Sequence, residues 1–173
     1  MMVGIDLVDL SDPLLKPRDE RALRLISHPA DHFPDHPLRF WHLWTAKEAV
    51  FKAYREIIPF DPKKIDITIS QEGNHLTFQS NNLRGSIFQE QSVIYAVAYS
   101  EDRPYHHQIL KRKTSSPSAE VRTMLIQYIK LNYDEETIIS ADEKGLPVLS
   151  HQWLPISFTH HHDYLGFMLP TPQ

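Results

Sequence analysis

Several kinds of residue and segment are scarce or absent in this chain of 173 residues. It has no cysteine, which excludes disulfides and thiolate chemistry. It has five glycines against thirteen prolines and no G-x-x-x-x-G-K or G-x-G-x-x-G pattern, which excludes the common glycine-rich phosphate loops. No apolar run is long enough to span a membrane, and no basic segment leads into an apolar run at the start. We therefore expect a cytoplasmic protein without a membrane partner.

The charge and composition narrow the class of protein further. Hydrophobic residues make up 41% of the chain and charged residues 23%, values typical of soluble globular proteins. The formal net charge of −4 argues against a nucleic-acid partner, because such partners are held by basic surfaces. The length suits one domain or two small lobes.

One long helix, predicted from about Leu38 to Ile58, organises the chain and ends before Pro59. Its apolar positions recur with helical spacing, as an amphipathic helix requires, at Leu43, Ala46, Val50, Tyr54 and Ile57. A neighbouring face carries Trp44, Glu48 and Lys52, three or four residues apart. Taken alone, this face is also typical of a plain surface ion pair, worth only about 0.3–0.5 kcal/mol.

Strands are predicted on both sides of this helix. Residues 2–10 form the first, with Asp6 among apolar neighbours, where a buried carboxylate would need a partner. Alternating segments at 65–70, 76–78, 84–88 and 93–99 follow the helix. Residues 103–116 are polar and lack periodicity, so we expect a linker there. The predicted organisation is a first lobe at 1–102, the linker at 103–116, and a second lobe at 117–173 with a helix and short strands at 138–140, 155–164 and 165–169.

Three segments carry side chains suited to chemistry: Gly4-Ile5-Asp6, the Trp44–Lys52 helix face, and Ser157-Phe158-Thr159-His160. Together they resemble the motifs of the 4′-phosphopantetheinyl transferases, namely a Gly-Ile-Asp strand, a Trp-x-x-Lys-Glu-Ala/Ser-x-x-Lys helix and a Ser-x-Ser/Thr-His segment. The resemblance implies Mg²⁺-dependent transfer of the 4′-phosphopantetheine arm of coenzyme A to a serine of an apo acyl or peptidyl carrier protein, as in the holo-[acyl-carrier-protein] synthases. It also implies an α+β pseudo-dimer of two lobes, each a helix packed on an antiparallel sheet.

The resemblance assigns roles to particular residues. Asp6 and Glu48 match the metal carboxylates, and Glu48 is also placed to take the serine proton. Lys52 completes the catalytic group by bringing an ammonium to the phosphates. The residues implied in binding coenzyme A are His160, Lys52, Lys144 and Thr159. An exposed helix after Pro17 carries Arg21 and Arg24, whose charge suits an acidic carrier protein.

The chain departs from the family pattern in several places. Val8 stands where two-lobed members usually have a second carboxylate, and the next acid is Asp9. Leu146 replaces the lysine of the family's Gly-Lys-Pro turn, where Lys144 is a possible substitute. The histidine segment closes the chain instead of preceding Gly-Ile-Asp, so we expect the two lobes in permuted order and a monomer that builds the site between its own halves.

Two alternatives stay open. The first is a catalytically degenerate module of the same fold that only binds carrier proteins. The second is a zinc site built from the histidine runs at 106–107 and 160–162, although adjacent histidines on a strand point to opposite faces. Most of the eleven histidines are expected to be ordinary polar residues.

Overall fold

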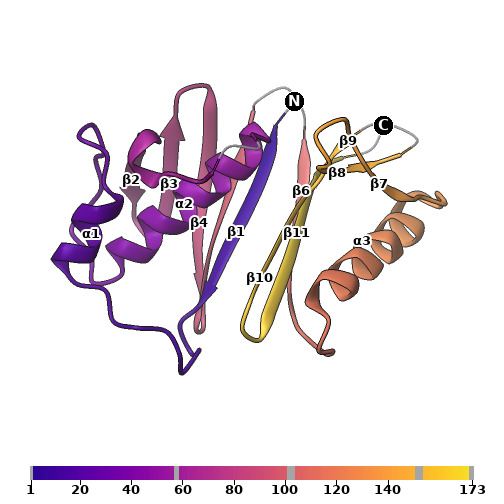
Figure 1. Cartoon of the computed structure of the whole chain (residues 1–173), viewed down its shortest axis with the longest axis horizontal. Coiled ribbons are helices and arrows are strands. Elements are labelled where there is room, and N and C mark those ends of the chain that lie inside the picture. The colour runs from indigo at the N-terminus through magenta and orange to yellow at the C-terminus, as the bar shows by residue number, and fades with distance from the viewer. Residues whose placement is uncertain (1, 57–58, 101–103, 151–153, 172–173) are drawn as a thin grey trace.

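A computed structural model of the chain describes residues 2–56, 59–100, 104–150 and 154–171. Its helices and antiparallel sheets form an α+β fold with two halves that lie side by side, and strand β1 stands between them (Figure 1). None of the helices in these ranges is long and apolar enough to cross a membrane.

The first half is a five-stranded antiparallel sheet in the order β1-β5-β4-β3-β2. Its strands are β1 (Val3–Asp9), β2 (Thr68–Glu72), β3 (His75–Ser80), β4 (Leu83–Glu90) and β5 (Val93–Tyr99). Every residue of β1 is buried, because one face of the strand meets a helix and the other meets the second half. The predicted first strand and the predicted strand at 93–99 are therefore confirmed.

Helix α2 (Arg39–Tyr54) packs against one face of this sheet, with α1 (Glu20–Ile26) and the short helix η1 (Pro62–Lys64) beside it (Figure 1). The contact with β1 is so close that a Cβ atom on Gly4 would lie 1.9 Å from the carbonyl oxygen of Ala49. Only glycine fits there, so the sequence at this point sets the distance between strand and helix. This distance brings the polar side chains of α2 within reach of Asp6.

The second half has its own helix and two small sheets. Helix α3 (Pro117–Tyr133) covers the sheet β10-β11-β6, and a three-stranded sheet β7-β8-β9 lies next to it. The strands are β6 (Tyr105–Lys111), β7 (Ile139–Ala141), β8 (Pro147–Leu149), β9 (Leu154–Pro155), β10 (Ser157–His161) and β11 (Tyr164–Pro170). Each half thus packs a long helix on an antiparallel sheet. The predicted pseudo-dimer symmetry stays a prediction.

Several predicted boundaries were wrong. Tyr105–Lys111, in the segment expected to lack periodic structure, is the strand β6, which pairs with β11 throughout its length. Helix α2 ends at Tyr54, because Arg55 adopts the left-handed conformation with φ 55°; residues 57–58 of the predicted helix lie outside the described residues. The strand predicted at 65–70 begins only at Thr68, and the one predicted at 155–164 divides into β9, β10 and the start of β11. The division into two lobes and a linker at 1–102, 103–116 and 117–173 stays a prediction, apart from this strand.

Side chains of β10 join the two halves at the free edge of β1. The backbone N–H groups of Ile5 and Leu7 donate to Ser157 Oγ at 3.1 Å and to Thr159 Oγ1 at 3.2 Å. One pair further along, the N–H of Asp9 donates to Nδ1 of a histidine of β10. An edge strand would otherwise expose these donors. The alternate residues of β10 satisfy them, which fixes the register of the second half against β1.

Candidate functional site

The centre of the candidate site is an ion pair between α2 and β1. Lys52 Nζ lies 2.7 Å from Asp6 Oδ1 and also donates to the carbonyl oxygen of Ile5 at 3.2 Å. The lysine side chain is 29% exposed and the aspartate side chain 12%, so the pair is open to solvent on one side. A ligand can therefore reach both charges.

Glu48 lies one helical turn before Lys52 and belongs to the same group of charges. Burial and, to a smaller extent, the negative charge of Asp6 raise the pKa of Glu48, Lys52 lowers it, and the net result is a pKa of about 7. No hydrogen bond or ion pair to its carboxylate is found within the described part of the chain. A carboxyl group that titrates near neutral pH suits proton transfer at that pH.

Thr159 brings the second half to this group. Its hydroxyl accepts the hydrogen bond from Leu7 N and donates to Asp6 Oδ1 at 3.2 Å. Asp6 Oδ1 thus receives two donors, one from α2 and one from β10. Nothing in the sequence spacing reveals this contact, since Asp6 and Thr159 are 153 positions apart.

The structure places His160 differently from Thr159. By strand alternation it lies on the other face of β10, and its side chain is exposed. Among the described residues it makes no hydrogen bond or ion pair with Asp6, Glu48 or Lys52. The structure thus brings Asp6, Glu48 and Lys52 together with Thr159, and within the described part of the chain His160 does not join this group through a polar contact.

A cavity of about 190 Å³ lies next to Lys52, between the two halves. It is lined by residues of both: Phe51, Lys52, Arg55, Glu56, Leu146, Pro147, Ile156, Ser157 and Phe158. Arg55 spans it, donating to the carbonyl oxygens of Ile156 and Pro147 and pairing with Asp142 at 2.8 Å. Sequence reasoning missed Arg55 because its role depends on the left-handed conformation that turns the chain out of α2.

The remaining predicted site residues are exposed on the surface. Lys144 is exposed in the turn before β8, where its N–H donates to Asp142 Oδ1. Arg21 and Arg24 are exposed on α1. Val8 is buried in the core against α2 and offers no ligand atom.

The motif on α2 contains a second lysine whose role was not predicted from the sequence. Lys47 is fully buried; its Nζ lies 2.7 Å from Asp31 Oδ2 and also donates to the carbonyl oxygens of Pro62 and Ile65. These three acceptors use all three N–H groups of the ammonium. Its position next to Ala46, on the apolar side of the predicted helix, was the available signal, because a lysine there needs a buried partner.

Within the described ranges, the first histidine run, His106 and His107, belongs to no group of potential metal ligands, so the alternative of a zinc site shared by both runs gains no support. His106 stacks on Tyr128 with ring centroids 4.0 Å apart, and His107 lies among aromatic rings. The one group of three potential metal ligands found in these ranges contains His162 with Asp9 and Asp163.

The arrangement of Asp6 and Glu48 fits a divalent cation. Two carboxylates in a largely buried site repel each other, which contributes to the raised pKa of Glu48. Their oxygens are the hard ligands that Mg²⁺ takes in proteins, usually with several waters and substrate phosphates. Asp6 and Glu48 would hold the cation, and Lys52 would add a positive charge beside it.

A carboxylate pair with an adjacent lysine, placed at a cleft between two lobes, defines a site suited to phosphoryl-type transfer. The family model of the 4′-phosphopantetheinyl transferase superfamily matches residues 2–109 of the chain. The chain therefore belongs to this superfamily, whose members transfer phosphopantetheine, use coenzyme A as substrate and typically need a divalent metal. The matched segment contains Asp6, Glu48 and Lys52 and ends before Thr159 and His160. No curated protein and no solved structure matches the chain.

Proposed function

We propose that this protein is a Mg²⁺-dependent 4′-phosphopantetheinyl transferase of the holo-[acyl-carrier-protein] synthase type. The serine hydroxyl of an apo carrier protein would attack the pyrophosphate of coenzyme A. A new P–O bond forms to the serine, the bond to the adenosine-phosphate half breaks, and that half leaves. The observation that carries the proposal is the group of Asp6, Glu48 and Lys52, which Thr159 of the second half completes.

Glu48 is the proposed base. With a pKa of about 7 it is partly ionised at neutral pH, and it takes the serine proton directly or through a water. Asp6 is held in place by Lys52 and Thr159. The bound cation would neutralise charge on the pyrophosphate, and Lys52 would stabilise the charge that develops on the transferred or leaving phosphate.

Coenzyme A is proposed to lie across the cavity between the halves. Lys52 and Ser157 line this cavity, and the buried Thr159 lies two residues after Ser157 on β10. His160 and Lys144, both exposed on the second half, are proposed to contact phosphates at the rim. Leu146, which replaces the family's turn lysine, lines the cavity with apolar atoms and gives no phosphate contact of its own.

The carrier protein is proposed to dock at α1. Arg21 and Arg24 are exposed there, and the exposed Leu25 lies beside them at a cavity of about 410 Å³ between α1 and α2. A basic and apolar surface suits the acidic region around the modified serine of carrier proteins. Because one chain supplies both sides of the site, we expect a monomer, which light scattering would establish.

The test is mass spectrometry of apo-carriers from fatty-acid, polyketide and peptide synthesis after incubation with coenzyme A and Mg²⁺. Gain of the phosphopantetheine mass on one of them supports the enzyme and identifies its carrier. The alternative, a degenerate module that only binds carriers, predicts a complex without any gain in mass. This alternative is less favoured because Asp6, Glu48 and Lys52 are all present and close together.

A further inference from the structure

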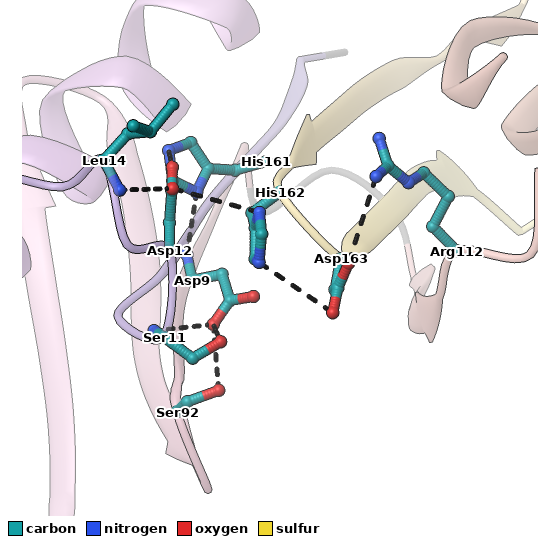
Figure 2. A network of polar contacts seen from close by, with 9 residues as sticks. All are labelled: Asp9, Ser11, Asp12, Leu14, Ser92, Arg112, His161, His162 and Asp163. Carbon is teal, nitrogen blue, oxygen red and sulfur yellow. Dashed lines mark hydrogen bonds and ion pairs between the residues drawn. The ribbon is translucent and has the colours of Figure 1, made fainter. Parts of the chain in front are cut away.

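A second polar group lies at the far end of β1, outside the candidate transferase site. Asp9, the last residue of β1, faces the two-residue turn between β10 and β11, which consists of His162 and Asp163. Ligand atoms of these three side chains all lie within 4.8 Å of one another. Figure 2 shows them pointing toward a common centre, with Asp9 coming from the first half and the other two from the second.

One oxygen of Asp9 lacks a partner. Oδ1 accepts from Ser11 N at 2.9 Å, from Ser11 Oγ at 2.7 Å and from Ser92 Oγ at 2.9 Å. Oδ2 is buried without a hydrogen-bond partner among the described residues, and in Figure 2 it lies on the side of His162. A buried carboxylate oxygen without a partner is costly, so Oδ2 is suited to bind a cation.

The Asp9 carboxyl group lies among several hydrogen-bond donors. Burial alone would raise the pKa of this carboxyl, but hydrogen bonds from Ser11 and Ser92, and the nearby N–H of Asp163, hold it below the ordinary value. The side chain of Asp9 is fully buried.

Asp163 and His162 each have a further charged side chain nearby, on the side away from the proposed ion. Asp163 Oδ2 faces His162 Nε2 at 3.9 Å, while Oδ1 lies 3.9 Å from the Arg112 guanidinium. On the other side of the imidazole, His162 Nδ1 lies 3.9 Å from Asp12 Oδ1. A carboxylate behind the second ring nitrogen is the usual support of a metal-binding histidine. The guanidinium of Arg112 approaches the oxygen of Asp163 that is turned away from the imidazole.

From this geometry we infer that Asp9, His162 and Asp163 form a binding site for a divalent transition-metal ion, separate from the proposed Mg²⁺ site. One imidazole nitrogen and two carboxylate oxygens suit Zn²⁺, Co²⁺ or Mn²⁺ better than Mg²⁺. Ligand atoms at ~2.0–2.2 Å from one ion are about 3–4 Å apart, so small side-chain rotations close the site.

The two metal sites would lie on opposite faces of β1. Asp6 shares the α2 face of the strand with Val8, whereas Asp9 shares the other face with Leu7 and Ile5. An ion at Asp9 would bind the β10–β11 turn to the end of β1. Its role would be to hold the two halves together, and the transfer chemistry would not pass through it.

Tag-free protein provides the test, because an affinity tag of histidines would bind the same ions. We would titrate Zn²⁺ by calorimetry and Co²⁺ by its visible d–d absorption, in an Asp6→Asn, Glu48→Gln background that removes the proposed Mg²⁺ ligands. We expect one ion per chain, visible cobalt bands, and a thermal midpoint that rises by about 5–10 °C at a hundredfold excess over Kd.

Two variants locate the ion. His162→Gly removes the imidazole and keeps a residue suited to the left-handed backbone, since φ is 48° at this position. Asn81→Gly is the matched control, because Asn81 occupies the equivalent place in the β3–β4 turn with φ 49°. We expect His162→Gly and Asp163→Asn to weaken binding more than about 100-fold and Asn81→Gly to leave it unchanged.

The outcomes are distinguishable. Absence of Zn²⁺ and Co²⁺ binding in the folded background protein overturns the inference, and so does binding that survives both His162→Gly and Asp163→Asn. If the background variant does not fold, the same titration of the unmodified chain applies, with loss of one equivalent in His162→Gly as the supporting result. Transferase activity is not a readout here, so failure of this site leaves the proposed function untouched.

Discussion

Helix α2 makes two lysine–aspartate ion pairs with the same nitrogen–oxygen distance, and these pairs differ in solvent exposure and in their other partners. Lys47 Nζ lies 2.7 Å from Asp31 Oδ2, and Lys52 Nζ lies 2.7 Å from Asp6 Oδ1. The side chains of the first pair are 0% and 1% exposed, whereas those of the second are 29% and 12% exposed. Distance alone therefore does not separate a structural ion pair from a functional one.

The partners of each pair show what the difference means. Around Lys47 every donor is used, and Asp31 also accepts from the N–H groups of His28 and Ile67. Desolvation lowers the pKa of Lys47, while the pair with Asp31 opposes that shift. Around Lys52 the neighbouring Glu48 has a raised pKa, and its carboxylate makes no hydrogen bond or ion pair with the described residues. All polar groups of the Lys47–Asp31 pair have partners within the protein. The Lys52–Asp6 pair lies next to the Glu48 carboxylate, which a bound cation could partner.

Removing the buried lysine should have the largest effect on stability. Lys47→Met leaves the Asp31 carboxylate uncompensated in the interior, which costs about 3–5 kcal/mol. Urea unfolding would measure this loss, with Lys64→Met as the control, since Lys64 is 77% exposed. We expect the folded fraction to keep its transferase activity. A loss of less than about 1 kcal/mol would mean that the pair is not structural.

Breaking the exposed group should instead affect the reaction. Asp6→Ala or Glu48→Ala should lower the rate of phosphopantetheine transfer by orders of magnitude, since lost charge stabilisation of this kind costs about 3–4 kcal/mol. The fold should persist, because one of two repelling carboxylates is gone. Single-turnover mass spectrometry would measure the rate, with the exposed Glu72→Ala as control. Near-normal transfer by Glu48→Ala at saturating Mg²⁺ would contradict the proposed mechanism.

The sequence allowed those parts of the fold to be predicted whose periodicity is unbroken. β1, β5 and α2 have clear alternation or helical spacing, although the helix ends at Tyr54, before the prolines that were expected to stop it. β6 was not predicted because adjacent histidines, one on each face of the strand, pack against aromatic rings. His106 stacks on Tyr128 of α3, while His107 packs near Tyr95 on the other side. Strands of this kind lack the apolar alternation on which prediction depends.

The same limit applies to the candidate site. Asp6, Glu48 and Lys52 were predicted from short motifs, but these motifs gave no role to Lys47, whose buried partners come from a distant loop and a short helix. The contact of Thr159 with Asp6 depends on the register of β10 against β1, which arises only on folding. The separation of Asp9 from Asp6 was accessible, because residues three apart on a strand face opposite sides.

A smaller effect is expected in the pH dependence of stability, which tests whether Glu48, beside the Lys52–Asp6 pair, is protonated in the folded protein. The pKa of Glu48 is about 7 in the folded protein against an ordinary value of 4.5, so between these values the folded state keeps a proton that the unfolded state has lost. The free energy of unfolding therefore falls as pH rises through this window. Glu48→Gln removes the fall and should be more stable than the unmodified protein by about 2 kcal/mol at pH ~8.

Urea unfolding in the presence of a chelator, at pH values about 5 and 8, would measure this difference. Glu72→Gln, an exposed substitution of the same kind, controls for the lost charge. If the advantage of Glu48→Gln is the same at both pH values, Glu48 has an ordinary pKa and its burial does not affect its charge.

The smallest expected effect concerns Lys52 acting on its neighbour. Lys52 lowers the pKa of Glu48 against the opposing influence of burial and of Asp6. Lys52→Gln should therefore raise the pKa of Glu48 above about 7, while unfolding changes by less than about 1 kcal/mol because the pair with Asp6 is partly exposed. NMR titration of the glutamate side-chain carboxyl carbons would measure this pKa in the variant, in which the Lys47–Asp31 pair is left intact. An unchanged pKa would show that the two side chains are not electrostatically coupled, and the functional half of the comparison would then rest on Asp6 alone.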